Sequence, residues 1–257
     1  MDISNRILDK YNEIFNNLPS WGEGNLKFGD RLVRISSIAT QYYCEQKLEL
    51  QHHYPLPPTK IMQDGEEAHE NVAVLAKPIA RDENVRIAVE KREKPICIYE
   101  FDVAFVHKGV PIIGKVDEAW FRGGDIELVV ERKFSDKLSV YSPYHIQAQL
   151  YCLGLGRMGF NTARTSYKIM IFKRGCLDCP ELSQRSCAIL ALGTSYFRCI
   201  IGEARAFTYP FSQVGILREL DWAVDFWLGK REAIPTKNGA KCQACEYKSL
   251  CSLSLAK

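Results

Sequence analysis

Acidic and basic side chains recur at short spacings in the middle of this 257-residue chain. Asp117 lies in the segment GKVDEAWF, and Glu131 and Lys133 lie in the segment ELVVERKF. In a β-strand, alternate side chains point to one face, so Glu131 and Lys133 share a face while Arg132 points away. Two carboxylates on adjacent strands are hard oxygen ligands of the kind that Mg²⁺ and Mn²⁺ prefer. An ion held there can polarise a phosphodiester and activate water, and a nearby lysine can offset charge developing on the phosphate.

The expected strands determine whether these side chains meet. Three β-rich runs are separated by glycine-containing turns: 96–107, 110–121 and 126–134, with Lys108-Gly109 and Gly123-Gly124-Asp125 between them. This spacing predicts a three-stranded antiparallel meander, in which pairing across the second turn brings Asp117 close to Glu131. An E-x-K triplet alone is weak evidence, because solvated strand faces often carry such residues. Its place across a turn from Asp117 strengthens the prediction.

The remaining segments predict helices around these strands. Apolar residues recur at helical spacing over residues 2–18. Ser36 and Ser37 favour the start of a second helix that carries Cys44, and Asp64 with Glu67 favours a third through about residue 76. Further elements are expected as helices at 142–154 and 211–228, a strand at 166–173 and a β-like run at 196–209. The fold class is therefore α+β, with a central mixed sheet flanked by helices.

Two further pairs flank the strands. Gly65 and His69 form G-x-x-x-H on the third expected helix, where a neutral imidazole would be another metal ligand. An ordinary surface or capping histidine fits the same position. Gln147 and Tyr151 lie four residues apart, hence on one helical face. That face either contacts DNA or is simply half-buried.

Taken in order, G-x-x-x-H, Asp117, E-x-K and Q-x-x-x-Y resemble the RecB-type branch of the PD-(D/E)XK nuclease superfamily, over Gly65 to Tyr151. The resemblance implies a restriction-endonuclease-like core and a Mg²⁺- or Mn²⁺-dependent deoxyribonuclease. It implies roles for the matching residues as follows: metal ligation by His69, Asp117, Glu131 and the backbone carbonyl of Arg132, catalysis by Asp117, Glu131 and Lys133, and DNA binding by Gln147 and Tyr151.

Ten cysteines are unusual in a chain without a secretion signal, and metal or cluster ligation explains them better than disulfides do. Cys242, Cys245 and Cys251 have C-x-x-C-x5-C spacing, and Cys44 is a plausible remote partner. This pattern resembles the iron–sulfur exonucleases of the same superfamily, and most of all the CRISPR-associated exonuclease group. The resemblance implies a 4Fe–4S cluster on these four cysteines. A structural zinc is the closest rival, since four thiolates suit both.

A second group of cysteines lies outside that family pattern. Cys176, Cys179 and Cys187 either bind a second metal, with Cys199 or Cys152 as the fourth ligand, or are unconnected thiols. A further alternative is that one of the three replaces a ligand of the first cluster.

The resemblance also implies a domain division and a biological role. Residues 1–34 form a helical extension, serving as an oligomer contact or as extra packing, and residues 35–257 form the nuclease domain closed by the cysteine segment 242–251. The expected function is a DNA exonuclease acting on single-stranded ends in CRISPR adaptation. The expected partners are DNA, as single strands or duplex ends, and CRISPR integrase proteins. The alternatives are a repair or replication nuclease, and a DNA-binding iron–sulfur protein with little nuclease activity.

Composition sets few limits on this reading. The net charge of +3 neither requires nor excludes nucleic acid as a partner. No apolar run is long enough to span a bilayer, and the first residues lack a basic segment followed by an apolar one. These observations predict a cytoplasmic protein without a membrane partner.

Overall fold

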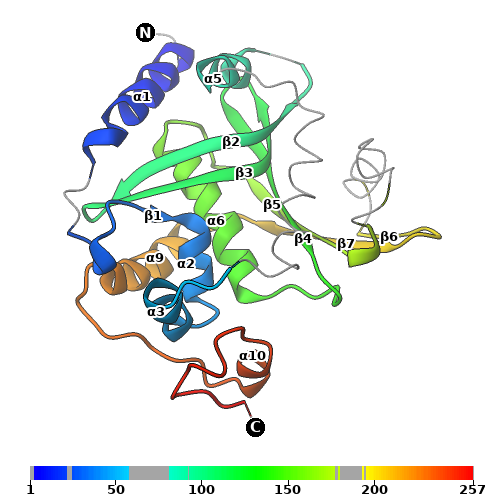
Figure 1. Cartoon of the computed structure of the whole chain (residues 1–257). Coiled ribbons are helices and arrows are strands. Elements are labelled where there is room, and N and C mark those ends of the chain that lie inside the picture. Colours follow the sequence, from blue (N-terminus) through cyan, green and yellow to red (C-terminus); the bar gives the residue numbers. More distant parts are fainter. Residues whose placement is uncertain are drawn as a thin grey trace.

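A central sheet organises the chain, and the computed structural model describes residues 3–21, 25–57, 81–91, 93–176, 179, 193 and 195–256. The sheet is mixed and seven-stranded, and helices flank it (Figure 1), which confirms the predicted α+β class. The strands are β1 (Val33–Arg34), β2 (Ile96–His107), β3 (Val110–Arg122), β4 (Asp125–Phe134), β5 (Ser166–Phe172), β6 (Tyr196–Arg198) and β7 (Glu203–Pro210). Their order is β1-β3-β4-β5-β7-β6, with β2 paired to β3.

The predicted meander of β2, β3 and β4 is confirmed, with antiparallel pairing at both steps. Lys108 and Gly109 both have positive φ angles, of 48° and 81°, in the turn between β2 and β3. Gly123 and Gly124 likewise have φ angles of 59° and 91° between β3 and β4. Two consecutive left-handed residues give the turn whose twist matches that of a hairpin, so these dipeptides set the register of all three strands.

The two edges of β3 are paired differently. Along one edge β2 pairs with β3 from Ile96–Phe121 to His107–Val110. Along the other edge β1 pairs in parallel at Ile112 and Ile113, and β4 pairs from Glu118 onward. Residues 114–117 therefore lie between β1 and β4, and the edge of β3 is open to side chains there.

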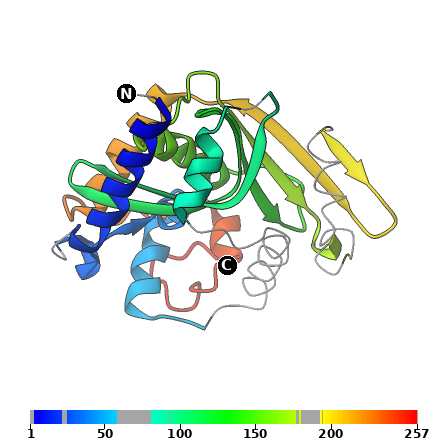
Figure 2. The same ribbon diagram turned by 90° about the horizontal axis from the view of Figure 1, so that it is seen from above.

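The flanking helices pack against strands β2 to β5. Helix α6 (Ser142–Arg157) contacts α2 (Ile35–Gln41), α9 (Gln213–Trp227) and strands β2 to β5. Helices α1 (Ile3–Asn17) and α5 (Arg81–Val89) lie side by side next to β2 (Figures 1 and 2). Ile7 and Tyr11 of α1 are buried in the main hydrophobic core, whereas the division at residue 34 stays a prediction.

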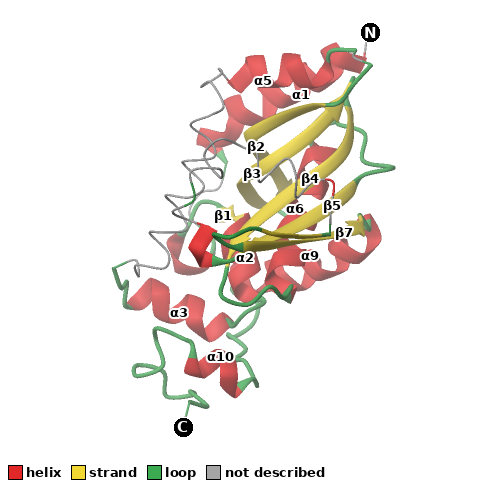
Figure 3. Ribbon diagram, turned by 90° about the vertical axis from the view of Figure 1, so that its right-hand side faces the viewer, coloured by secondary structure: helices red, strands yellow, loops and turns green. Residues whose placement is uncertain are grey.

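The C-terminal segment gathers with α3 (Glu45–His53) at one end of the molecule, where α10 (Gly239–Gln243) also lies (Figure 3). The prediction of one helix carrying Cys44 was wrong, because α2 ends at Gln41 and Cys44 is the extended residue that precedes α3. The helix expected over 64–76 lies outside the described residues. None of the helices in the described ranges is long and apolar enough to cross a membrane.

Candidate active site and cysteine-lined cavity

Asp117 and Glu131 meet where β3 and β4 part. The last pair of the ladder is Glu118 with Val130, so Asp117 and Glu131 are the next residues on their strands. The backbone N–H of Arg132 donates a hydrogen bond of 2.7 Å to Oδ2 of Asp117. The carboxylate of Asp117 therefore lies against the backbone of β4, at the residue that follows Glu131.

Lys133 forms an ion pair with Glu131 inside the protein. Its Nζ lies 2.5 Å from Oε1 of Glu131, whose side chain is 1% exposed. Among the described residues Oε2 of Glu131 has no hydrogen-bond partner. Burial, and then the charge of Asp117, raise the pKa of Glu131 to about 8, against the opposing effect of Lys133. Although burial lowers the pKa of Lys133, the charges of Glu131 and Asp117 raise it overall, so the amine stays protonated.

A hydrogen-bonded chain joins this pair to α6. Lys133 Nζ donates to Oε1 of Gln147 at 3.1 Å, and Nε2 of Gln147 donates to the hydroxyl of Tyr151 at 3.1 Å. Tyr151 is only 4% exposed, which leaves little ring surface for stacking on a base. Burial, and then the charges of Glu131 and Asp117, raise its pKa well above the ordinary value. The geometry favours a positioning role for both residues, holding the amine of Lys133 in place.

Gly114 explains how α6 reaches the open edge of β3. A Cβ at this position would lie 2.8 Å from Cδ1 of Ile35 and 2.9 Å from Cε1 of Tyr151. Real side chains do not approach so closely, so only glycine admits both neighbours. The sequence G-K-V-D thus supplies both the packing surface for Tyr151 and the carboxylate of Asp117.

Sequence reasoning missed Glu100. It stands on β2 between the pairs Tyr99–Glu118 and Phe101–Val116, hence opposite Asp117. Its φ angle is 53°, a left-handed conformation that is uncommon for glutamate. The charge of Glu100 contributes to the raised pKa values of Glu131 and Tyr151, so it adds negative charge to the site. Counting pairs outward from the two-residue turn at Lys108-Gly109 would have found it.

The side chain of Arg132 points to the other face of the sheet, as strand alternation predicts. It pairs there with Glu118, and the two residues are 1% and 0% exposed. This buried pair joins β3 to β4 directly behind Asp117 and Glu131. The expected role of the Arg132 carbonyl as a metal ligand stays a prediction.

The two carboxylates, with Oε2 of Glu131 buried and lacking a hydrogen bond, are donors that fit a hard divalent cation. His69, the expected third ligand, lies outside the described residues. Within the described ranges no three His, Cys, Asp or Glu side chains are close enough to hold a metal ion. The described residues thus supply two ligands of an incomplete set.

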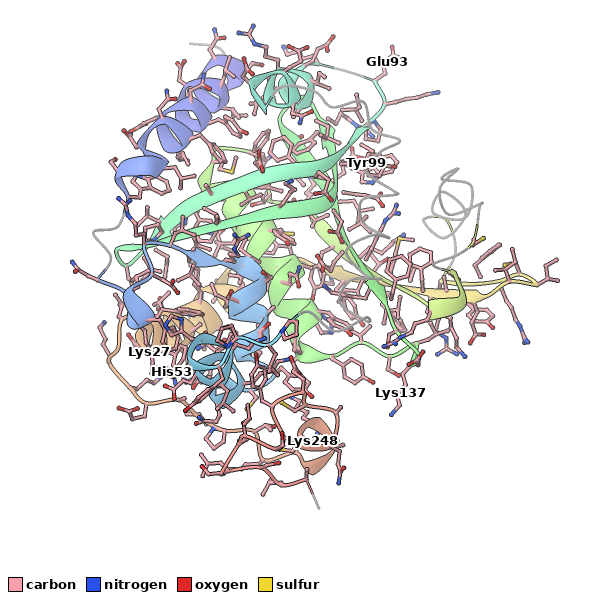
Figure 4. The ribbon with its side chains drawn as sticks, in the orientation of Figure 1. Lys27, His53, Glu93, Tyr99, Lys137 and Lys248 are labelled. Carbon is pink, nitrogen blue, oxygen red and sulfur yellow. The ribbon has the colours of Figure 1, made fainter. Side chains whose placement is uncertain are left out.

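The four cysteines predicted to bind a cluster line one small cavity. Cys44 comes from the start of α3, and the remaining three come from α10 and the tail: Cys242, Cys245 and Cys251. Lys248, labelled in Figure 4, belongs to the same wall. Burial raises the pKa of Tyr43 to about 12, and Cys245, Cys44 and Cys242 are among the neighbours that add to this shift. The donor set suits a cluster or zinc.

The cavity that these cysteines line is small. Its volume is about 20 Å³, little more than one water needs. Among the described residues no three of these cysteines are close enough to hold a metal ion, so either a zinc ion or a 4Fe–4S cluster would require the tail to shift relative to α3.

Protein contacts already fasten the tail to α3. Arg231 donates from both terminal nitrogens to the carboxylate of Glu45 at 2.6 Å each, and the N–H of Ile234 donates to the same carboxylate at 2.7 Å. The N–H of Thr236 donates to Sγ of Cys44 at 3.4 Å. A metal centre would reinforce an existing connection.

The second cysteine group is only partly described. Cys176 and Cys179 are buried in a small hydrophobic cluster on the far face of the sheet. Burial, followed by the nearby Cys199 and Cys179, raises the pKa of Cys176. Cys152 instead lies in the main core, so Cys199 is the better candidate of the two for a shared site. Cys187 lies outside the described residues, and the second metal stays a prediction.

Comparison with known proteins leaves the family open. No protein-family model matches the sequence, and no curated protein matches it. Among solved structures, the crystal structure of SSO0001 matches with a TM-score of 0.46 and 13% sequence identity, over 97% of this chain and 96% of that one. A similarity of this size establishes neither a family nor an activity.

Proposed function

We propose that this protein is a metal-dependent DNA exonuclease. The observation that carries the proposal is the convergence of Asp117 and Glu131, from neighbouring strands, beside the partly buried side chain of Lys133. Asp117 and Glu131 offer two carboxyl groups in a water-poor site, and a divalent cation would stabilise both in their ionised form. The ordered motif series of the sequence supports phosphodiesters as the substrate.

Each residue has a distinct task in this proposal. Asp117 and Glu131 hold Mg²⁺ or Mn²⁺, with His69 and the carbonyl of Arg132 as proposed further ligands. The bound ion supplies polarisation of the phosphodiester and acidification of water. Lys133, oriented by Gln147, places its positive charge where negative charge develops on the scissile phosphate.

A nuclease assay tests the proposal. Purified protein is incubated with linear, fluorescently labelled single-stranded DNA in Mn²⁺. Asp117→Asn and Lys133→Ala should slow cleavage by at least about a hundredfold. Asp136→Asn and Lys137→Ala, two exposed neighbours, are matched controls that should leave the rate unchanged. Equal cleavage by all four variants would mean that this site is not the source of activity.

For the four cysteines we propose a 4Fe–4S cluster with a structural role. The cavity that they share and their mixed origin support a centre that links α3 to the tail. Zinc is the alternative outcome, since four thiolates suit both centres.

Metal analysis of protein purified without oxygen distinguishes these outcomes. A cluster gives about four iron atoms per chain and a brown colour, whereas zinc gives one colourless ion. Cys242→Ser should release the metal, and Cys199→Ser, from the other group, should retain it. Unchanged iron in Cys242→Ser would contradict the cluster assignment.

A role in CRISPR adaptation with integrase partners is proposed on the sequence resemblance alone. A repair or replication nuclease uses the same chemistry. Genomic neighbours of the encoding gene test this choice independently of the active site.

A further inference from the structure

A second feature lies next to the active site and is not explained by catalysis. A cavity of about 370 Å³ opens between the end of α1, the start of α2 and the ladder of β2 and β3. Its volume falls within the range of about 300–1,000 Å³ typical of small-molecule sites. Figure 1 shows β1 and α2 beside these strands.

The cavity is connected to the proposed catalytic residues through the side chain of Tyr151. Tyr151 forms part of its wall, and the hydroxyl of Tyr151 accepts the hydrogen bond from Gln147 that continues to Lys133. Lys115 and Gly114 line it from the open edge of β3, two and three residues before Asp117. A ligand in the cavity would therefore adjoin the proposed scissile bond.

The charges of the wall suit an anion. Arg34 and Lys115 are exposed cations, and Asp102 is the acidic side chain among the described lining residues. Lys115 pairs with Glu100 at 3.5 Å, but both are partly exposed, and such pairs are weak. Lys115 thus remains available to a phosphate. The hydroxyl of the exposed Ser36 adds a donor.

Another part of the lining is apolar. Phe15 and Leu18 reach the cavity from α1 and the turn after it, and both are half-buried. Bases of single strands stack on aromatic rings without regard to sequence, and Phe15 supplies such a ring. A ligand with one anionic end and one flat apolar face therefore fits, and a nucleotide has both.

We infer that this cavity binds one nucleotide of a single DNA strand, with its phosphate on Arg34 and Lys115 and its base against Phe15 and Leu18. The inference rests on the proposed nuclease function and assigns the segment 1–34 a role in substrate binding. The cavity places the bound nucleotide next to Asp117, so the strand would be cut close to it.

Binding measured without divalent ions tests the inference separately from cleavage. A short fluorescent single-stranded DNA is titrated with Arg34→Gln, Lys115→Gln and the double variant, and anisotropy is recorded. Each single change should raise Kd about fivefold and lower the slope of log K against log salt by about 0.7. The exposed positions keep the fold intact.

Lys10→Gln and Arg157→Gln are charge-matched controls, because they line a separate cavity of about 600 Å³. Their Kd should stay within about twofold of wild type, because removing a distant positive charge weakens DNA binding only slightly. The inference would be overturned if the test and control variants lost DNA affinity equally, or if the wild type did not bind DNA. If the wild type cleaves DNA but the Arg34 and Lys115 variants bind it with unchanged Kd, only the cavity assignment is wrong. If the wild type binds DNA but does not cleave it in Mn²⁺, the nuclease proposal is wrong.

Discussion

The N–H of Arg132 donates to the carboxylate of Asp117 at 2.7 Å, in place of a further backbone rung between β3 and β4. This bond fixes the side chain of Asp117 to the strand that carries Glu131. The two carboxylates are therefore held together by the sheet itself, before any metal is bound. Preorganisation of this kind lowers the cost of assembling a metal site.

Proton release should accompany Mn²⁺ binding. Because the pKa of Glu131 is raised to about 8, part of the metal-free protein carries a proton there near neutral pH. The cation must displace that proton, so affinity should rise with pH and level off above about 8. Calorimetry in two buffers of different ionisation enthalpy should show about one proton released per ion. A pH-independent affinity would contradict the burial of Glu131.

The same shift predicts how stability depends on pH. The folded state holds the proton of Glu131 more tightly than the unfolded chain does, because the ordinary pKa is 4.5. The contribution of protonated Glu131 to the free energy of unfolding is fully present below pH 4.5 and is lost as pH rises through about 8. The Tm of the metal-free protein should fall in this window, and Mn²⁺ should reduce the fall. Because the two proteins differ only at this residue, the Tm difference between Glu131→Gln and wild type should change with pH. A constant difference would contradict this assignment.

Gln147 should affect catalysis more than binding. Gln147→Leu removes the acceptor that orients the Lys133 amine, and we expect kcat to fall about tenfold, or about 1.4 kcal/mol, with KM little changed. Gln149→Leu, on another face of α6, is the matched control and should retain full activity. A rise in KM at constant kcat would instead indicate direct substrate contact by Gln147.

Gly114 should tolerate no side chain. Gly114→Ala places a Cβ within 3.0 Å of both Ile35 and Tyr151, and we expect a loss of about 1–3 kcal/mol in the free energy of unfolding. Displaced Tyr151 should also lower activity. Gly239→Ala, whose Cβ would have ordinary contacts of 3.5 Å or more, is the control. Urea unfolding of both variants measures the difference, and equal stability would show that α6 does not pack into the open edge of β3.

The Glu118–Arg132 pair should matter for stability rather than chemistry. Both side chains are buried, so Glu118→Gln leaves the guanidinium without its charge partner and should cost about 3–5 kcal/mol. The double variant Glu118→Leu, Arg132→Met should recover much of that loss. Urea unfolding checks both. A double variant as unstable as the single one would contradict the pairing.

The strands could be predicted from the sequence because their signals are local. The turns at Lys108-Gly109 and Gly123-Gly124 set the register of β2, β3 and β4, and the register brings Asp117 to Glu131. The same register places Glu100 opposite Asp117, but Glu100 belongs to none of the sequence motifs and was therefore not predicted as a site residue.

The helix predictions were wrong where tertiary contacts override the local sequence pattern. QYYCEQK contains neither glycine nor proline, so it reads as one helix. In the structure Glu45 binds Arg231 and the N–H of Ile234, and Cys44 faces the tail, and these long-range contacts divide the segment into α2 and α3. Helix α5 was not predicted, because the sequence RDENVRIAV has only a short apolar face.

Direct Mn²⁺ binding tests the central claim, that Asp117 and Glu131 together hold a hard dication. Calorimetric titration of wild type, Asp117→Asn, Glu131→Gln and the exposed control Asp136→Asn gives the affinities without any substrate. We predict that each active-site change weakens binding by at least about tenfold, or 1.4 kcal/mol, and that the control matches wild type. Four equal affinities would show that any bound ion lies elsewhere, and the proposed active site would have to be abandoned.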